Sequence, residues 1–221
     1  MTETRTFSAS HHVVAILAMA AVVVASNFLV QFPVEHFIGG VNLADTLTWG
    51  AFTYPVAFLV TDLTNRRFGP TAARKVVIAG FLIAVVLSIW LATPRIAIAS
   101  GTAFLVAQLL DVTIFDRMRK LAWWKAPITS SFIGSVIDTL LFFGIAFSAS
   151  FAFIDGLFGM DDSSLAFPVP FLGISDDTQA LLWVSLAVGD FLVKMLVAVA
   201  LLAPYRLVLG LFQAMPKGTA A

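Results

Sequence analysis

The run VVIAGFLIAVVLSIWLAT, from Val76 to Thr93, contains 18 residues and not one charge. A helix needs about 20 mostly apolar residues to cross the hydrocarbon core of a bilayer. Because lipid offers the backbone no hydrogen-bond partners, such a run must bond within itself, as an α-helix does. The run therefore predicts a membrane-spanning helix.

The chain on both sides of this run has the same apolar character. Of its 221 residues, 60% are hydrophobic and only 12% are charged, whereas a typical soluble domain carries about 25% charged residues. We therefore predict an all-α transmembrane fold, a single six-helix bundle in which residues 1–221 form one integral membrane domain. The predicted spans cover residues 13–32, 46–64, 75–93, 96–115, 128–153 and 178–203.

The two ends of the chain need separate treatment. The first apolar run, from Val13 to Val30, is longer than the usual core of a signal peptide, so we expect a retained helix. The last apolar piece, from Tyr205 to Met215, is too short to span a bilayer. We expect that piece to lie at the membrane interface.

Basic residues gather on one side of the predicted membrane. Six alternating spans place 11 of the 13 lysines and arginines on the side that also carries both termini. Only Arg95 lies in a segment on the other side, together with most of the acidic loop residues. Loops rich in Lys and Arg stay in the cytoplasm, so both termini are predicted to be cytoplasmic.

Composition and motifs exclude several classes of function. A formal net charge of zero disfavours nucleic acid as a partner. Without cysteine there are no disulfides and no thiolate ligands for metals. The phosphate-binding, zinc-protease and serine-hydrolase motifs GxxxxGK[ST], HExxH and GxSxG are all absent. We therefore predict no catalytic residue, no metal site, no cofactor and no enzymatic activity.

Asp138 is the most informative polar residue within a predicted span. It lies near mid-depth of the fifth helix, on the same face as Ser131, Gly134 and Ser135. A charge at this depth costs at least about 2.5–3.5 kcal/mol, so such residues are usually functional. Two interpretations remain open: Asp138 is a ligand-binding carboxylate, or it is a buried partner for Lys194.

Asp190 and Lys194 are four residues apart on the sixth predicted helix, also near mid-depth. An i,i+4 pair of this kind can neutralise itself without any ligand. With Asp138, however, two acids and one base lie at one level of the membrane. The surplus carboxylate then needs a proton, a donor group or a ligand.

The fourth predicted helix carries Gln108 and Asp111, and the second carries Asp62. Gln108 is a candidate for the site. Asp62 and Asp111 lie near the cytoplasmic ends of their helices, where pairing with a nearby arginine explains them as well as a function does.

Further candidates lie in the outer halves of the first two helices. Asn27 is one of them, although hydrogen bonding between helices explains it equally well. Trp49 and Tyr54 precede Pro55, which is expected to free a backbone carbonyl and kink the helix there. Carboxylates that seek donors, together with aromatic faces, suit a flat, neutral solute rich in N–H groups.

Six stretches of the chain resemble the bacterial queuosine precursor transporter family, which belongs to the vitamin-uptake transporter group. They extend from about Ser26 to Tyr205 and read SNFLVQFP, TWGAFTYPVAFLVTDLTNRRFGPTAAR, AQLLDVTIFDRMR, WWKAP, SFIGSVIDTLLFFGIAF and DFLVKMLVAVALLAPY. The resemblance implies a six-helix inner-membrane importer of 7-deazaguanine bases, chiefly 7-cyano-7-deazaguanine and also its aminomethyl relative. It further implies a fold like the substrate-capturing subunits of energy-coupling-factor vitamin transporters, with no ATPase partner expected.

The chemistry of a deazaguanine then suggests roles for the polar residues. A carboxylate can accept the ring N–H and the exocyclic amine together, and Asp138 is our first choice for it, with Asp190 second. Lys194 or Gln108 would donate to the ring carbonyl, and Trp49, Tyr54 or Phe143 would stack on the ring. Two alternatives stay open: a binding subunit that needs a separate ATPase and takes another small vitamin-like solute, and an assembly factor without ligand. The energy source and the oligomeric state cannot be predicted from the sequence.

Overall fold

The computed structural model describes residues 9–30, 32–38, 41–43 and 47–214, and most of these residues are helical. The helices are α1 Ala9–Leu29, α2 Gly50–Thr53, α3 Pro55–Phe68, α4 Pro70–Leu91, α5 Pro94–Met118, α6 Lys125–Phe147, α7 Phe153–Leu157, α8 Leu182–Ala200 and α9 Leu202–Ala214, with a 3₁₀ turn at Ala149–Phe151. The strands are β1 Phe37–Ile38, β2 Val41–Asn42, β3 Pro168–Phe171 and β4 Ser175–Leu181.

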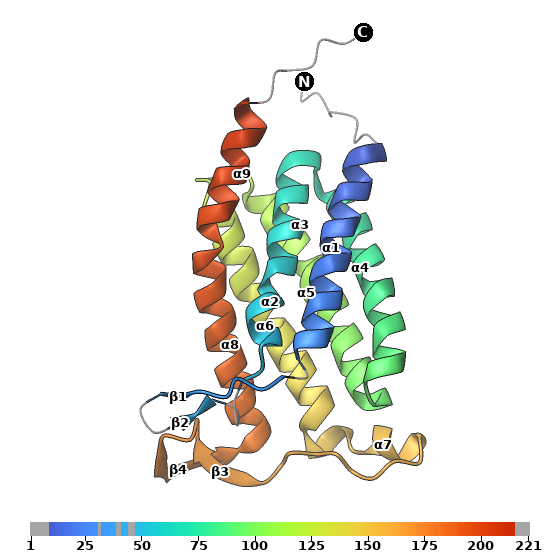
Figure 1. Cartoon of the computed structure of the whole chain (residues 1–221), viewed down its shortest axis with the longest axis vertical. Helices are drawn as coiled ribbons and strands as arrows, with labels where there is room; N and C mark the ends of the chain where they lie inside the picture. The colour runs from blue at the N-terminus through green and yellow to red at the C-terminus, as the bar shows by residue number, and fades with distance from the viewer. Residues whose placement is uncertain (1–8, 31, 39–40, 44–46, 215–221) are drawn as a thin grey trace.

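The long helices run side by side in one elongated bundle (Figure 1). The start of α1 and the end of α9 lie at one end of this bundle, and α7 and both short hairpins lie at the other. Each hairpin is antiparallel, β1 with β2 and β3 with β4. The prediction of a purely helical chain missed these hairpins, because strands of two to seven residues carry too little periodicity to recognise.

Four helical segments of the described part are long and apolar enough to cross a membrane: Pro70–Leu91, Pro94–Met118, Lys125–Phe147 and Leu182–Leu211. A shorter apolar helix covers Val13–Leu29. The chain is therefore a mostly helical, multi-pass membrane protein. The uncharged run that begins at Val76 lies within α4 as far as Leu91, as predicted, and its last two residues follow the helix.

The fifth and sixth predicted spans differ from the observed helices at their ends. The fifth predicted span stops at Phe147 because Ser148 turns extended, and the sixth begins only at Leu182 because β4 precedes it. At the other end, α9 continues from α8, and Tyr205 is buried against Phe115. The described part of the expected interfacial segment, from Tyr205 to Ala214, belongs to α9, and Met215 lies outside the described residues. Pro204 lies in the first turn of α9, where the helix does not need the N–H that proline lacks.

A tight contact between α3 and α6 determines how the polar residues meet. A Cβ placed on Gly134 would lie 2.9 Å from Cε1 of Phe58, closer than real contacts allow. Glycine at this position therefore lets the two helices approach. The main apolar core lies on the other side of α3, between α1, α4 and α5, around Met19, Val76 and Phe104.

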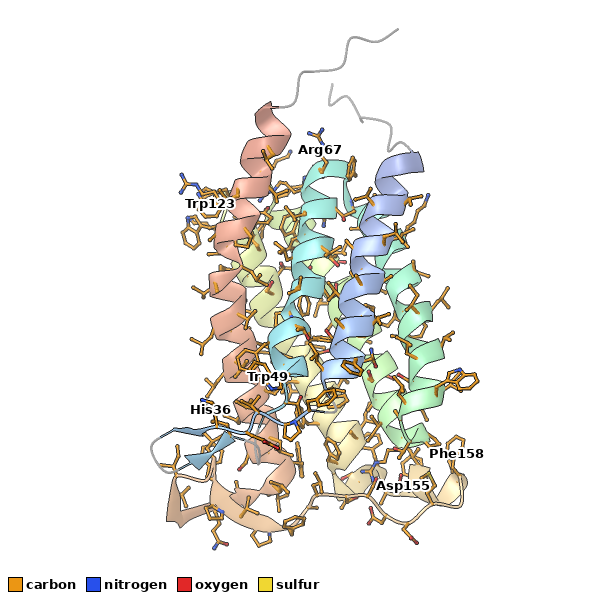
Figure 2. All side chains as sticks on the ribbon, viewed as in Figure 1. His36, Trp49, Arg67, Trp123, Asp155 and Phe158 are labelled. Carbon is orange, nitrogen blue, oxygen red and sulfur yellow. The ribbon has the colours of Figure 1, made fainter. Side chains whose placement is uncertain are left out.

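Arg95 joins α5 to the end of α6 and to α7 at one end of the bundle. Arg95 is fully buried, and its guanidinium lies 2.7 Å from the Asp155 carboxylate and donates to two carbonyls at the end of α6. Burial opposes ionisation of Asp155, but hydrogen bonds from Arg95 and Ser163 hold its pKa below the ordinary value. Figure 2 shows Asp155 at the end opposite Arg67 and Trp123.

Candidate functional site

Lys194 lies between two carboxylates in the middle of the bundle. Its Nζ is 2.7 Å from Oδ2 of Asp138 and 2.5 Å from Oδ2 of Asp190. Asp138 and Lys194 are only 3% and 4% exposed. The structure thus brings together the three residues that the sequence placed at one level, and it joins α6 to α8 through them. We call Asp138, Asp190 and Lys194 the central cluster.

Two hydroxyl groups complete the central cluster. The Tyr54 hydroxyl donates to Oδ1 of Asp138 at 3.0 Å, and the Thr139 hydroxyl donates to Oδ2 of Asp190 at 3.1 Å. The ammonium of Lys194 also lies 5.3 Å from the centre of the Tyr54 ring, within range of a cation–π contact. Tyr54 reaches this position because Pro55 interrupts the helix there and starts α3.

The acceptors of the central cluster are not equally used. Both oxygens of Asp138 have donors, Tyr54 on one and Lys194 on the other. Asp190 receives Lys194 and Thr139 on Oδ2, and no hydrogen bond reaches its Oδ1 from the part of the chain that the structure describes. Its side chain is also the more accessible, at 14% exposed. Asp190 therefore has an acceptor left for a ligand.

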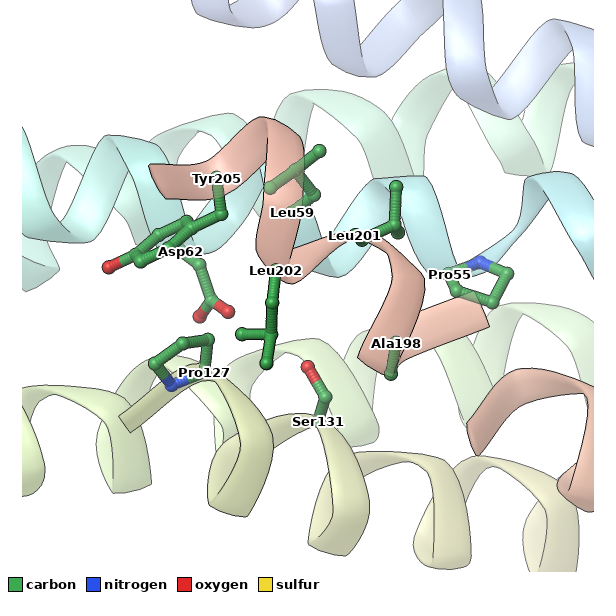
Figure 3. Close-up of a pocket in the computed structure, with 9 residues that line it drawn as sticks. All are labelled: Pro55, Leu59, Asp62, Pro127, Ser131, Ala198, Leu201, Leu202 and Tyr205. Carbon is green, nitrogen blue, oxygen red and sulfur yellow. The ribbon is translucent and has the colours of Figure 1, made fainter. Parts of the chain in front are cut away.

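A small cavity of about 20 Å³ lies between α3, α6 and the α8–α9 helix (Figure 3). It has room for about one water molecule, far less than the roughly 300–1,000 Å³ that is common for ligand sites, so a base does not fit into it in this conformation. Pro55 is next to Tyr54 in the chain, and Ala198 is one helical turn beyond Lys194, but no residue of the central cluster lines the cavity. Its lining consists of Pro55, Leu59, Asp62, Pro127, Ser131, Ala198, Leu201, Leu202 and Tyr205.

A second buried polar group lies at the contact between α3 and α5. Asp62 is 2% exposed and Asp111 is fully buried, and hydrogen bonds from Thr61 to Gln108 and from Asn65 to the Val112 carbonyl join their helices on either side of them. The Ser130 hydroxyl of α6 donates to Asp62 at 3.5 Å. We call Asp62 and Asp111 the acid pair. Pairing with an arginine does not explain it, because the nearby Arg66 donates to the Tyr205 hydroxyl and to backbone carbonyls instead.

The other predicted site residues lie away from the central cluster. Gln108 is fully buried, and its carbonyl accepts from Thr61 in the contact between α3 and α5. Asn27 donates to the Val23 carbonyl of its own helix at 2.9 Å. Trp49 is 49% exposed, toward the end of the bundle that carries Asp155 (Figure 2). A substrate role for Gln108, Asn27 and Trp49 remains a prediction.

Phe143 also lies apart from the charged residues. Its ring is buried and packs against Phe142 and Phe147, with centroids 5.1 and 5.9 Å apart. Thr139, in contrast, was not predicted although it contacts Asp190. The signal was present, since a polar residue directly follows Asp138 in an otherwise apolar stretch. No group of three or more His, Cys, Asp or Glu side chains that could hold a metal ion occurs within the described ranges.

Comparisons with known proteins identify the family. A family model described as "Putative vitamin uptake transporter" matches residues 48–93 and 86–208, well over half of the chain. The chain belongs to this vitamin uptake transporter family. The resemblance predicted from the sequence is thereby confirmed, and the family is one of transporters rather than enzymes.

Individual members of the family carry more specific names. A "Probable queuosine precursor transporter" of Haemophilus influenzae is 35% identical over 86% of this chain and 82% of its own length. The "Queuosine precursor transporter" of Escherichia coli K12 is 34% identical over 83% of this chain and 79% of its own. A "Probable queuosine precursor transporter" of Bacillus subtilis is 28% identical over 46% of this chain and 57% of its own. No solved structure matches the chain.

Proposed function

We propose that this membrane protein imports queuosine precursors, chiefly 7-cyano-7-deazaguanine and also its 7-aminomethyl form, for the synthesis of queuosine in tRNA. The observation that carries this proposal is the central cluster, two carboxylates and one ammonium enclosed by helices in the middle of the bundle. Membership of the family and the names of its members support the same substrate.

The central cluster offers the groups that a deazaguanine needs. Asp190, with Oδ1 unoccupied, accepts the ring N–H, and it thus replaces Asp138 as our first choice. Asp138 holds Lys194 and Tyr54 in place, and Lys194 donates to the ring carbonyl. The Tyr54 ring, edge-on to Phe58 and Phe104 at 6.4 and 6.2 Å, offers an aromatic face beside the ammonium.

The finer topology also belongs to this proposal. Six crossings follow if α1, α2 with α3, α4, α5, α6 and α8 with α9 each span the membrane once. The end of the bundle that carries Arg66, Arg67 and Arg119 is then cytoplasmic, as are both termini, in the inner membrane of a bacterium. Residues 1–221 would form one domain, like a substrate-capturing subunit of an energy-coupling-factor transporter.

The alternative is a binding subunit that captures another vitamin-like solute and relies on a separate ATPase. Purified chain reconstituted alone into liposomes separates the two. Uptake of labelled 7-cyano-7-deazaguanine without any partner supports an independent importer. Binding of this base without uptake shows dependence on a partner, and absence of both binding and uptake supports another solute.

The test of the function itself is complementation. A bacterial strain that makes no 7-deazaguanine and lacks its own importer receives a low concentration of the base, with or without this gene. Queuosine in tRNA should appear only with the gene and should fail with Lys194→Met. The exposed Lys125 of the cytoplasmic end offers a matched control, and Lys125→Met should restore queuosine like the wild type. Equal queuosine with and without the gene would refute the proposal.

A further inference from the structure

The acid pair is buried without the partners that two charges would require. Neither oxygen of Asp111 has a hydrogen-bond partner within the described ranges, and the same holds for Oδ1 of Asn65 and Nε2 of Gln108. All three side chains are fully buried. An ionised carboxylate is not stable in an apolar interior without donors or a counter-charge. Something that the protein itself does not supply must therefore complete this group.

Two charged or titratable side chains of the described chain approach Asp62, one member of the acid pair. Arg66 approaches Asp62 from the same helix, and Tyr205 approaches it from α9. Arg66 donates its hydrogen bonds to the Tyr205 hydroxyl, at 2.9 Å, and to the carbonyls of Arg119 and Trp123. From α6 only the neutral Ser130 hydroxyl reaches Asp62. No cation is therefore hydrogen-bonded to either carboxyl group in the described chain.

Two buried carboxyl groups with so few donors cannot both carry a charge, and a proton on the pair resolves the conflict. The described residues include no group of three or more His, Cys, Asp or Glu side chains that could hold a metal ion. The chemistry of the acid pair thus favours a proton.

A small cavity borders one member of the acid pair. Asp62 belongs to the cavity lining, and Figure 3 shows its carboxylate between Tyr205 and Leu202. Pro55, next to Tyr54 in the chain, and Ala198, one helical turn beyond Lys194, line the same cavity. Room for about one water molecule thus lies between Asp62 and the turns that carry Tyr54 and Lys194.

We propose that Asp62 and Asp111 form a proton-binding pair that couples inward proton movement to substrate import, an inference that rests on the proposed function. In each cycle, one proton from the outer side binds to the pair and is released to the cytoplasm together with the base. No bond of the substrate forms or breaks, and no redox partner is needed.

The experiment uses the full chain in liposomes and labelled 7-cyano-7-deazaguanine. Two readouts are compared: accumulation driven by an acidic exterior, and exchange of labelled for unlabelled base at equal pH, which needs no net proton movement. For one proton per neutral base, each pH unit should raise the accumulation ratio by about tenfold. Asp111→Asn should abolish this gain and keep the exchange. Asp116→Asn, which changes a half-buried acid on the same helix that pairs only with Arg119 at the surface, should behave like the wild type.

The outcomes separate the two proposals. Exchange without any response to the pH gradient in the wild type overturns the proton coupling but leaves the importer intact, as does accumulation driven only by a sodium gradient. A full response to the pH gradient in Asp111→Asn also overturns it. If that variant does not fold, the wild-type response still decides. Absence of both uptake and exchange in the wild type would instead refute the proposed function.

Discussion

Substitutions at Lys194 and Asp190 are expected to separate stability from substrate binding. Lys194→Met removes the one ammonium that two buried carboxylates share, and it leaves them facing each other. Loss of one partner of a buried ion pair costs about 3–5 kcal/mol. The Lys194 ammonium lies 2.7 Å from Asp138 and 2.5 Å from Asp190. Because both carboxylates lose this partner, we expect a destabilisation at the upper end of the range.

Asp190→Asn should be much milder for folding. The Lys194–Asp138 pair remains at 2.7 Å, and the surplus negative charge of the central cluster is removed. The substitution removes a hydrogen bond to a charged group, which contributes about 1.5–3 kcal/mol. We expect a destabilisation at the lower end of this range, because the surplus negative charge of the central cluster is removed as well. Binding should suffer more clearly, since the ring N–H loses its charged acceptor. The same range of energies predicts a Kd for 7-cyano-7-deazaguanine about 10–100 times higher.

The assay is thermal unfolding and equilibrium binding of the labelled base on purified protein in detergent. Asp116→Asn, at a half-buried position of α5, is the control; it removes only a surface ion pair with Arg119 and should change neither quantity appreciably. Wild-type affinity of Asp190→Asn at normal folding would remove Asp190 from the substrate site. Equal destabilisation by Asp190→Asn and Lys194→Met would show that the central cluster serves folding alone.

Two further predictions concern the scaffold. Gly134→Ala should destabilise the protein by about 1–3 kcal/mol, because the new Cβ meets the buried Phe58 ring at 2.9 Å. The control is Gly144→Ala on the same helix, whose Cβ meets nothing within 4 Å. This variant should be neutral or stabilising in thermal unfolding. Asp155 has a lowered pKa in the folded protein, so its contribution to stability is present above the ordinary carboxyl pKa of about 3.9 and is lost as the pH falls through the folded value. Asp155→Asn should therefore lower the unfolding temperature at pH 7, by leaving Arg95 buried without its closest carboxylate, and should make the remaining stability less sensitive to acid.

The central cluster could be predicted because its signals are local and additive. Helical spacing placed Asp190 and Lys194 on one face, and depth placed Asp138 at the same level. The acid pair could not be predicted, because Asp62 and Asp111 lie near helix ends where a neighbouring arginine is the simplest partner. Only the packing of α3 against α9 shows that Arg66 turns toward Tyr205 instead. Contacts between helices, unlike spacing within one helix, leave little trace in a single sequence.

Proline explains why the cavity lies where it does. Pro55 and Pro204 lack the N–H that a continuous helix would use, and they coincide with the breaks between α2 and α3 and between α8 and α9. The cavity touches both breaks, at Pro55 on one side and at Leu201 and Leu202 on the other. Interrupted helices are tolerated at membrane depth where they line a cavity, and in many transporters they form the substrate site. The two breaks therefore border the same cavity as the buried Asp62 carboxylate.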